Sequence, residues 1–462
     1  HHMRREIIVD NEIQGILDKI RYHYRRRARI SLYKLLQSTH PAVLSDAFRH
    51  LTEIERSDIF QYIQRMSILK DFLPELDDMI IEELFEDKKP DDVAHIIHNL
   101  PAEDMVDILA LLPHRLSEQI QENLDKEELE EVQELFQYPE ESAGRIMSTQ
   151  FVTFEETFSV RKAIDRFQDM DEDTEAPFYI YVVDQSGRMV GVLSLRQLLL
   201  YPRSTILQDI MEKNFIAVSP ETDQEEAADI VSQYNYLAIP VLEKDNELVG
   251  VITVDDVIDI IREEATEDIL KMAGAGDDRE ILHKSTLESA RIRFPWLLAS
   301  WFGGVLALTV IDVFESLLEK TVVLAAFIPI IMGMGGNVGT QTSTIVVRGI
   351  ATDRINLNYV SSVIFKEIRV GMLLGIIYGF FLGLLAYYKY LDFQDPVMLG
   401  VVVGTAVFSA MAIASTIGVI LPIFLNKLKI DPAIATGPIV TTSVDIFGVI
   451  IYFYIASILI KI

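Results

Sequence analysis

The stretch AIATGPIVTTSVDIFGVIIYFYIASILI, residues 433–460, is long enough to cross a bilayer and carries one charged side chain, Asp445. A spanning helix takes about 20 mostly apolar residues, and a carboxylate at its centre costs about 2.5–3.5 kcal/mol on insertion scales. Asp445 should therefore face protein or water rather than lipid. Burial by hydrogen bonds inside a helical bundle is the alternative. We interpret Asp445 as a functional residue, with Pro438 breaking the helix before it and freeing carbonyls near Gly437.

Charge divides the chain into two halves of different character. The 290 residues before Arg291 carry a net charge of −31 and the remaining residues carry +2, which gives the −29 of the whole chain. An acidic soluble half thus precedes a membrane half. Its acidity disfavours nucleic acid as a partner and favours cations, divalent ions above all. The absence of cysteine excludes disulfides and thiolate metal sites.

The soluble half begins with a helical region. We interpret residues 1–30 as the remnant of a purification tag followed by a basic lead. Residues 31–140 show short amphipathic periods, and the pattern of His40–Leu51 recurs in Lys89–Leu100. A repeated helical unit of this kind predicts a stacked, all-α superhelical domain.

Two histidines in this helical region have a spacing that could hold a metal ion. His95 and His98 lie at i and i+3, on one face of a regular helix. Surface histidines are much commoner on helices than metal ligands are. The spacing therefore favours two surface histidines over a metal site.

Two β-α units follow, at residues 141–203 and 204–262. In each unit two apolar strands flank a turn, and the second strand ends in Val-Gly-Val before a helix begins. Arg145–Phe154 is likewise matched by Asp209–Val218. The paired layout resembles a tandem pair of CBS domains, which implies two α/β units packed against each other.

The resemblance to CBS domains implies a candidate adenine-nucleotide site, with ATP the expected ligand. Tyr179, Arg196 and Tyr236 would stack on the base and contact phosphate. The two tyrosines suit strand positions in a core equally well. Gln197 stands where an acidic residue would contact the ribose, which is a departure from the pattern.

Residues 254–290 connect these units to the membrane half and begin with a helix predicted over residues 254–272. Its apolar stripe consists of Val254, Val257, Ile258, Ile261, Ala265 and Ile269. Its acidic residues include Asp256, Asp259, Glu264, Glu267 and Asp268. Like charges at helical spacing destabilise a helix, and carboxylates select hard ions such as Mg²⁺ or Ca²⁺. A solvated charged face is the alternative to a cation site.

Five spans are predicted in residues 291–462. Their approximate ranges are 294–313, 321–346, 361–387, 397–425 and 434–460. Lysine and arginine concentrate in the loops after the second and fourth spans, which predicts a cytoplasmic soluble half and an outside C-terminus. Because five is an odd number for one internally duplicated transporter, a homodimer with a shared pore is expected.

The second span contains PIIMGMGGNVGTQTS, residues 329–343, which is rich in glycine and amide side chains. Gly333 and Gly335 are expected to pack against other helices. Gly336, Asn337 and Gln341 supply backbone or side-chain oxygens that could line a pore.

The segments GGNVGTQTSTIVVRGI in the second span and DPAIATGPIVTTSVDIFG in the fifth, with the CBS pair, the helical domain and the acidic connection, resemble the MgtE family of magnesium channels. The resemblance implies a homodimer whose second and fifth spans line the pore, with Asp445 binding hydrated Mg²⁺ on the axis and Gly437 beside it. The chain has Gly437 and Thr340 where the family pattern has asparagine.

The same resemblance makes the acidic connection the plug helix of the family. Cytosolic Mg²⁺ would bridge its acids to other domains. The bridging partners would be Asp431 at the pore mouth, Asp223 and Glu225 in the second CBS unit, and Asp91 or Asp92 in the helical domain.

We therefore predict a Mg²⁺-selective channel of the cell membrane, not an enzyme, which imports Mg²⁺ and closes when cytosolic Mg²⁺ binds its acidic domains. Two Asp445 carboxylates would hold the ion through its waters, because Mg²⁺ dehydrates reluctantly. The expected partners are a second copy of the chain, Mg²⁺ and membrane lipid. A proton- or sodium-coupled transporter or exporter is one alternative, and a membrane-anchored nucleotide sensor is another.

Overall fold

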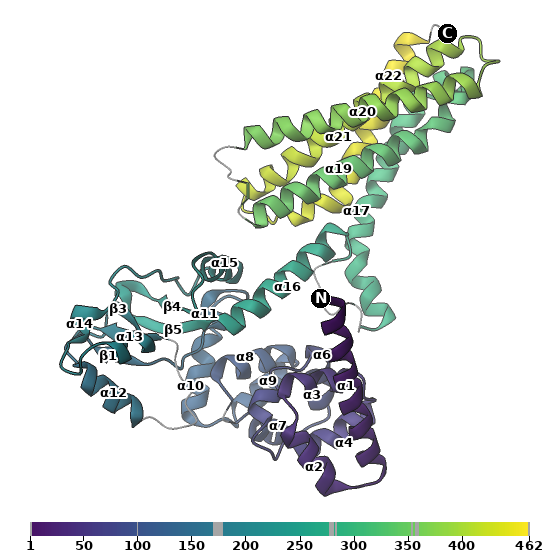
Figure 1. Ribbon diagram of the computed structural model, residues 1–462. Helices are drawn as coiled ribbons and strands as arrows, with labels where there is room; N and C mark the ends of the chain where they lie inside the picture. The colour runs from purple at the N-terminus through teal and green to yellow at the C-terminus, as the bar shows by residue number, and fades with distance from the viewer. Residues whose placement is uncertain are drawn as a thin grey trace. The chain divides into compact units, whose positions relative to one another are not determined.

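The computed structural model describes residues 2–98, 100–169, 179–276, 281, 284–352, 354–355 and 360–460, with side chains from residue 13 onward. The chain divides into two compact units, His1–Arg262 and Glu263–Ile462. Figure 1 labels their helices and strands. Each unit is described by itself.

The first unit begins with a stack of short helices, as the sequence predicts (Figure 1). Pro41 and Pro90 stand at first helical turns, where a missing N–H costs nothing. Thr52 and Asp125 close capping boxes that start two other helices. The helices are α1 (His2–Arg25), α2 (Arg29–Ser38), α3 (Pro41–Arg49), α4 (Glu53–Ile63), α5 (Leu69–Phe72), α6 (Asp78–Phe85), α7 (Pro90–Ile97), α8 (Ala102–Leu111), α9 (His114–Gln121) and α10 (Lys126–Leu135).

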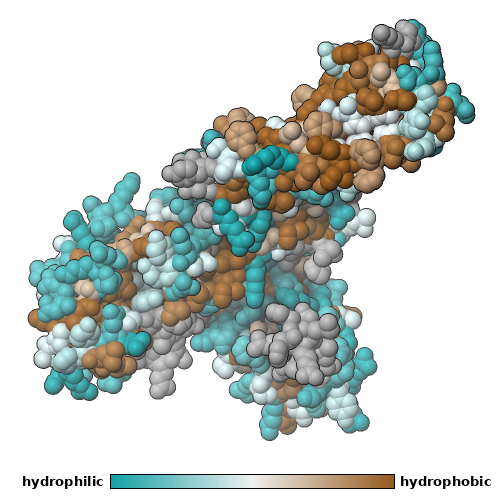
Figure 2. Space-filling model, turned by 45° about the horizontal axis from the view of Figure 1, so that its top comes forward, coloured by the Kyte–Doolittle hydropathy of each residue, from teal (hydrophilic) through white to brown (hydrophobic). Residues whose placement is uncertain are grey.

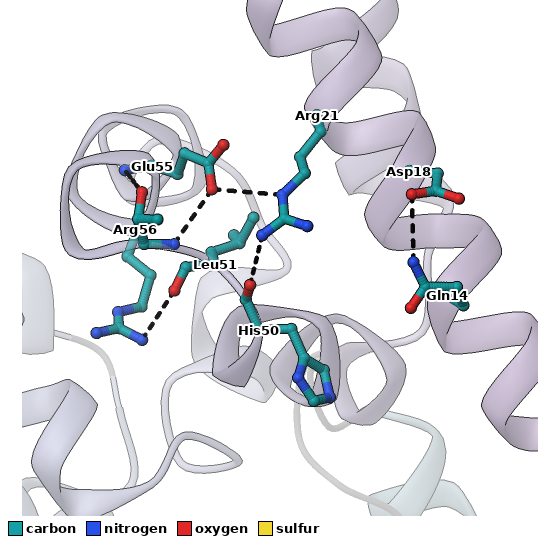
Figure 3. A network of polar contacts seen from close by, with 8 residues as sticks. Gln14, Asp18, Arg21, His50, Leu51, Glu55 and Arg56 are labelled. Atoms are coloured by element: carbon teal, nitrogen blue, oxygen red, sulfur yellow. Dashed lines mark hydrogen bonds and ion pairs between the residues drawn. The ribbon is translucent and has the colours of Figure 1, made fainter.

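Arginine side chains fix the turn between α3 and α4, as Figure 3 shows. Arg21 of α1 donates to the backbone carbonyl of His50 at 2.6 Å and pairs with Glu55 at 3.5 Å. Arg56 donates to the carbonyl of Leu51 at 3.2 Å. The last carbonyls of a helix lack helical partners, so these guanidinium groups satisfy them and tie α1 to the stack.

The two predicted β-α units follow. The first contains α11 (Ala143–Ile146), β1 (Thr153–Glu155), α12 (Val160–Gln168), β2 (Tyr179–Val183), β3 (Met189–Ser194) and α13 (Leu195–Leu200). The second contains α14 (Leu207–Ile210), α15 (Gln224–Tyr234), β4 (Ala238–Leu242), the 3₁₀ turn η1 (Lys244–Asn246) and β5 (Leu248–Thr253). Strand β1 pairs parallel to β2, while β2–β3 and β4–β5 are antiparallel pairs.

The repeated Val-Gly-Val segments are explained by how the two units interlock. A Cβ on Gly250 would lie 2.4 Å from Sδ of Met147, and one on Gly191 would lie 2.7 Å from Sδ of Met211. Each glycine thus admits a methionine from the other unit. Both the glycine and the methionine recur in the sequence because each unit inserts a methionine side chain against the glycine of the other unit.

The second unit contains the end of α16 (Val254–Met272) and the membrane helices. These are α17 (Thr286–Val313), α18 (Glu315–Lys320), η2 (Val322–Phe327), α19 (Ile328–Ala351), α20 (Ser361–Lys389), α21 (Pro396–Lys427), the π-helical turn η4 (Ala435–Ile439) and α22 (Val440–Leu459). Within the described residues, five helical segments are long and apolar enough to span a membrane. Hydrophobic residues cover much of their visible surface (Figure 2). Helix α17 begins at Thr286, before the expected start of the first span.

Glycines bring the membrane helices into close contact. A Cβ on Gly379 would lie 2.5 Å from the carbonyl oxygen of Gly404, so α20 and α21 touch backbone to backbone. Gly418 of α21 approaches Gly339 of α19 equally closely. Gly335 packs against Val444 as expected, whereas Gly333 is exposed and meets nothing within 4 Å in the described chain. The packing role expected of Gly333 is therefore not seen within this chain.

Candidate functional site

The helix is interrupted just before Asp445, as the sequence predicts. Residues Ala435–Ile439 form a π-helical turn in which Gly437 departs from helical geometry, with a ψ of −123°. The carbonyl of Gly437 accepts a hydrogen bond from Oγ1 of Thr441 at 3.3 Å. Thr436 shares a buried hydrogen bond of 3.0 Å with Ser343 of α19. These bonds hold the non-helical turn in one conformation against α19.

Polar groups of α19 and α22 share an exposed face. Asn337 and Gln341 lie one turn apart on α19, and both are exposed. On α22, Thr441 is exposed and lies against Gly336, and Asp445 is half-buried one turn further on. Exposed amides and a carboxylate would have no hydrogen-bond partners in hydrocarbon. This face, which we call the polar face, must therefore contact water or protein.

A lysine connects the end of α16 to the loop before η4. Nζ of Lys271 lies 2.7 Å from Oδ2 of Asp431 and also pairs with Glu267 one helical turn earlier. Oδ1 of Asp431 accepts a hydrogen bond from the N–H of Ala433 at 2.7 Å. Burial alone would lower the pKa of Lys271, but its bonds to Asp431 and Glu267 raise that pKa above its ordinary value. The ammonium group therefore stays charged and links α16 to the segment that leads into α22.

Within the described part of the chain, the groups around this lysine include more acidic residues than basic ones. Burial, and then the charge of Asp431, raises the pKa of Asp268 to about 6, while Lys271 and Arg348 act in the opposite direction. Glu264 also raises it, and Glu267 is buried. We call Glu264, Glu267, Asp268 and Asp431 the mouth cluster. Among the described residues, the four carboxylates of the mouth cluster outnumber the two basic groups that act on the pKa of Asp268, so a cation bound there would reduce the repulsion between them.

The glycine in the broken turn lets α16 approach α22 closely. A Cβ on Gly437 would lie 3.3 Å from N of Gly274 and 3.4 Å from the carbonyl oxygen of Lys271. Gly274 in turn lies against the ring of Pro438. The end of α16 therefore docks directly on the unwound turn, about 12 Å of helix from Asp445.

The apolar stripe expected along α16 is only partly buried: Val257 is 2% exposed, but the three isoleucines of the stripe are exposed. Ile258, Ile261 and Ile269 are 46%, 42% and 63% exposed, whereas the acidic Glu267 is 9% exposed. The acidic side of the helix end thus contacts the membrane unit, and the isoleucines form an uncovered apolar face.

Two buried acids of the first unit, Asp256 and Glu103, form a separate acidic site. Oδ2 of Asp256 accepts hydrogen bonds from the N–H and hydroxyl of Thr253 and so caps α16. Burial raises the pKa of Asp256 to about 6 and that of Glu103, in α8, to about 7. Neighbouring acids raise both pKa values further: Asp256 acts on Glu103, and Asp255 and Asp259 act on Asp256. Glu103 is thus an acid of the helical domain whose pKa responds to Asp256. The roles predicted for Asp91 and Asp92 as bridging acids stay predictions.

Replacing Glu103 with glutamine should stabilise the protein at alkaline pH. The folded pKa of about 7 lies above the ordinary 4.5, so ionising this carboxyl group destabilises the folded state. This destabilisation is absent below pH 4.5 and complete above pH 7. Glutamine stays neutral and can still accept the hydrogen bond of Ser148. We expect a gain of about 2 kcal/mol at pH 8 and almost none at pH 4.5. Thermal unfolding with Mg²⁺ chelated measures it, with exposed Glu122→Gln as control; an equal gain at both pH values would contradict the prediction.

The remaining acids predicted for regulation lie at helix starts and on surfaces. Asp223 caps α15 by accepting the N–H of Glu225 at 2.9 Å. Asp91 and Asp92 are exposed in the first turn of α7. Asp259 is exposed and pairs with Arg262 at 3.3 Å. Their roles as ligands stay predictions.

The residues considered for nucleotide binding occupy separate places. Tyr179 starts β2 and packs against one apolar cluster, whereas Tyr236 stacks on Tyr234 and packs against another. Arg196 is exposed on α13. The side-chain oxygen of Gln197 accepts the N–H and hydroxyl of Ser194 at 2.9 Å each. Gln197 therefore caps its helix, just as Asp256 caps α16.

Family models match three parts of the chain in order. A model described as "MgtE intracellular N domain" matches residues 39–141, a CBS domain model matches residues 143–204 and 207–263, and a model described as "divalent cation transporter" matches residues 328–455. The matches cover the helical stack, both β-α units and the helices that carry the polar face.

Curated relatives extend the similarity over most of the chain. A magnesium transporter MgtE of Bacillus subtilis is 38% identical over 72% of this chain and 73% of its own length. That of Thermus thermophilus is 35% identical over 74% and 76%. Among solved structures, the soluble part of a magnesium transporter is 28% identical, with a TM-score of 0.49 over 55% of this chain and 99% of that chain. A cytosolic domain of a Mg²⁺ channel MgtE in complex with ATP is 26% identical, with a TM-score of 0.42 over 53% and 99%.

Proposed function

Because the chain belongs to the MgtE family of divalent cation transporters, we propose that it is a homodimeric, Mg²⁺-selective channel that imports Mg²⁺ and closes when cytosolic Mg²⁺ rises. Members of this family are transporters and not enzymes. The observation that carries the proposal is the polar face, where Asn337, Thr441 and Asp445 lie exposed or half-buried on spanning helices. Two such faces meeting across an axis would enclose a polar path through the membrane.

Two surfaces support a homodimer. The polar face needs water or protein beside it, and a second copy of the chain supplies both when the two faces form a pore. The isoleucines of α16, namely Ile258, Ile261 and Ile269, form an apolar face that is 42–63% exposed among the described residues. An exposed apolar stripe on a helix is typical of a helix–helix contact. Lipid contacts the remaining apolar surface of the spans.

At the pore, Asp445 would hold Mg²⁺ through the ion's own waters. Magnesium keeps several waters because it dehydrates reluctantly, so an outer-sphere site avoids the cost of stripping them. Asn337, Gln341 and the backbone oxygens near Gly336 and Gly437 would accept hydrogen bonds from those waters. Weak binding of this kind allows the ion to leave as well as to enter.

Closure would act through the mouth cluster. Lys271 already links α16 to Asp431, and the carboxylates of the mouth cluster favour a divalent ion over a monovalent ammonium group. A bound Mg²⁺ would hold α16 against the turn before α22 and so obstruct the path to Asp445. Asp256, Asp259, Asp223 and Glu225, with Glu103, Asp91 or Asp92, would bind further Mg²⁺ and bring the soluble domains into the closed arrangement.

The chain is a multi-pass membrane protein. We place its N-terminal domains in the cytoplasm and its C-terminus outside, from the positive loops after the second and fourth spans. Adenine nucleotide stays a candidate ligand of the CBS pair through Tyr179, Arg196 and Tyr236. The oxygen of Gln197 is used for capping, and so is Oδ2 of Asp256, which leaves Oδ1 of Asp256 as the carboxylate oxygen that a ribose could contact.

Mg²⁺ uptake into proteoliposomes tests the function. With a Mg²⁺ gradient and no pH or sodium gradient, the intact protein should show passive uptake, faster for Mg²⁺ than for Ca²⁺. Uptake that requires an imposed pH or sodium gradient would instead make the protein a coupled transporter, and Asp445 would then be its coupling site.

Replacing Gly437 with alanine should weaken closure. The added Cβ would press on the backbone of Gly274 and Lys271 at 3.3–3.4 Å, and backbone cannot rotate away as a side chain can. We expect the Mg²⁺ concentration that half-inhibits uptake to rise roughly threefold, measured relative to each variant's own uptake at low Mg²⁺. Gly304→Ala, where a Cβ meets nothing within 4 Å, is the matched control. Unchanged inhibition in Gly437→Ala would show that this contact plays no part in closure.

A further inference from the structure

Three metal-ligating side chains meet in the helical domain where α7 ends and α10 begins. His98 is the C-cap of α7, Asp125 is the N-cap of α10 and Glu128 lies in the first turn of α10. One ligand atom from each lies within 4.8 Å of the other two. Nδ1 of His98 lies 2.7 Å from Oε1 of Glu128.

The capping box of α10 fixes the two carboxylates. Oδ1 of Asp125 accepts the N–H groups of Glu127 and Glu128 at 3.0 Å each, and Oε2 of Glu128 accepts the N–H of Asp125 at 3.3 Å. Each carboxylate thus uses one oxygen for the cap, and the second oxygen of Glu128, Oε1, lies against His98. The side chain of Glu128 is 13% exposed and that of His98 is 43% exposed, so an ion can arrive from solvent.

This donor set differs in kind from the oxygen-only sites of the polar face and the mouth cluster. One imidazole and two carboxylates are typical ligands of Zn²⁺, and the imidazole favours Zn²⁺, Co²⁺ or Mn²⁺ over Mg²⁺. We propose that His98, Asp125 and Glu128 bind one divalent transition ion, with Zn²⁺ preferred and water completing the shell. The ion takes the place of the proton that joins His98 to Glu128.

The site would connect α7 directly to α10, two helices that are separated along the chain by α8 and α9. Helix α8 packs on α10 and carries Glu103. An ion held between the end of α7 and the start of α10 would thus fix the part of the helical domain that faces Asp256. The protein thus has a site for transition ions that is separate from the path of the transported ion. This site does not depend on the proposed channel function.

Cobalt absorption spectroscopy of the full-length protein tests the site. The parent protein has His1 and His2 deleted, because these would bind metal, and about 10 mM Mg²⁺ occupies the oxygen-only sites. Co²⁺ should produce visible d–d absorption that saturates at one equivalent per chain and disappears when Zn²⁺ is added. No flux measurement enters, so a failed channel proposal leaves this result unaffected.

Variants decide whether these residues are the ligands. His98→Asn should weaken Co²⁺ binding roughly tenfold or more, while His95→Asn, an exposed histidine three residues away, should bind as the parent does. Asp125→Asn keeps a good N-cap and removes the ligand charge, so it should weaken binding while the thermal unfolding temperature without metal stays unchanged. Parent-like Co²⁺ spectra in His98→Asn, or equal loss in His95→Asn, would overturn the proposal.

Discussion

Replacing Asp445 with asparagine is expected to reduce Mg²⁺ uptake roughly a hundredfold and to leave the protein folded. At an effective dielectric constant of about 20, a carboxylate about 5 Å from a divalent cation attracts it by about 7 kcal/mol before desolvation is counted. Two copies would lose this attraction at the same place. Even a net loss of about 3 kcal/mol lowers occupancy roughly a hundredfold. Asparagine preserves size and hydrogen bonding, so helix packing should not change.

Initial Mg²⁺ uptake into proteoliposomes measures this loss. Asp392→Asn removes an exposed acid of the same unit, outside the polar face, and should take up Mg²⁺ as the parent does. Size-exclusion profiles and thermal melting of both variants check assembly. Parent-like uptake by Asp445→Asn would remove Asp445 from the conduction path.

Deleting residues 1–275 should abolish inhibition by Mg²⁺ on the domain side. The deletion removes the soluble domains and α16, and with them Lys271, Glu267 and Asp268 of the contact with Asp431. Uptake should then persist at Mg²⁺ concentrations that nearly stop the intact protein. We expect a difference of roughly tenfold or more at such concentrations, since closing a two-state gate firmly takes several kcal/mol.

A triple variant separates the mouth cluster from the rest of the soluble half. Glu264→Gln, Glu267→Gln and Asp268→Asn together keep every domain but remove three of the four carboxylates. This variant should recover most of the release seen on deletion. If the protein that lacks residues 1–275 is still inhibited by Mg²⁺, closure does not act through the soluble half. If that protein is released from inhibition but the triple variant is still inhibited, the mouth cluster is not where the ion acts.

Hydropathy and periodicity predicted the architecture because both depend on neighbours along the chain. The spans, the break at Gly437 and Pro438, and the strand–turn–strand units were all available from local sequence. The sequence predicts a separate helix before the first span, whereas α17 runs continuously from Thr286, after a Ser285 capping box, through that span.

The partners of the charged residues could not be predicted in the same way. Periodicity places the isoleucines of α16 on one stripe and the acids on another, but only tertiary packing decides which stripe is buried. Lys271 was visible as a rare base at the end of an acidic helix, yet its bond to Asp431 joins residues 160 positions apart. Glu103 is one of many acids in first helical turns, and the sequence gives no signal that Asp256 lies near it.

The central claim, that the polar face lines the conduction path between two copies, can be tested with a single cysteine. The chain has no cysteine, so Asn337→Cys creates a unique thiol. Treatment of proteoliposomes with a short bismaleimide should produce covalent dimers and stop Mg²⁺ uptake, while Leu373→Cys, 59% exposed on α20, should do neither. Two results together would contradict a shared pore on this face: Asn337→Cys forms no cross-linked dimer, and its Mg²⁺ uptake is unchanged after a thiol reagent has modified the thiol at position 337.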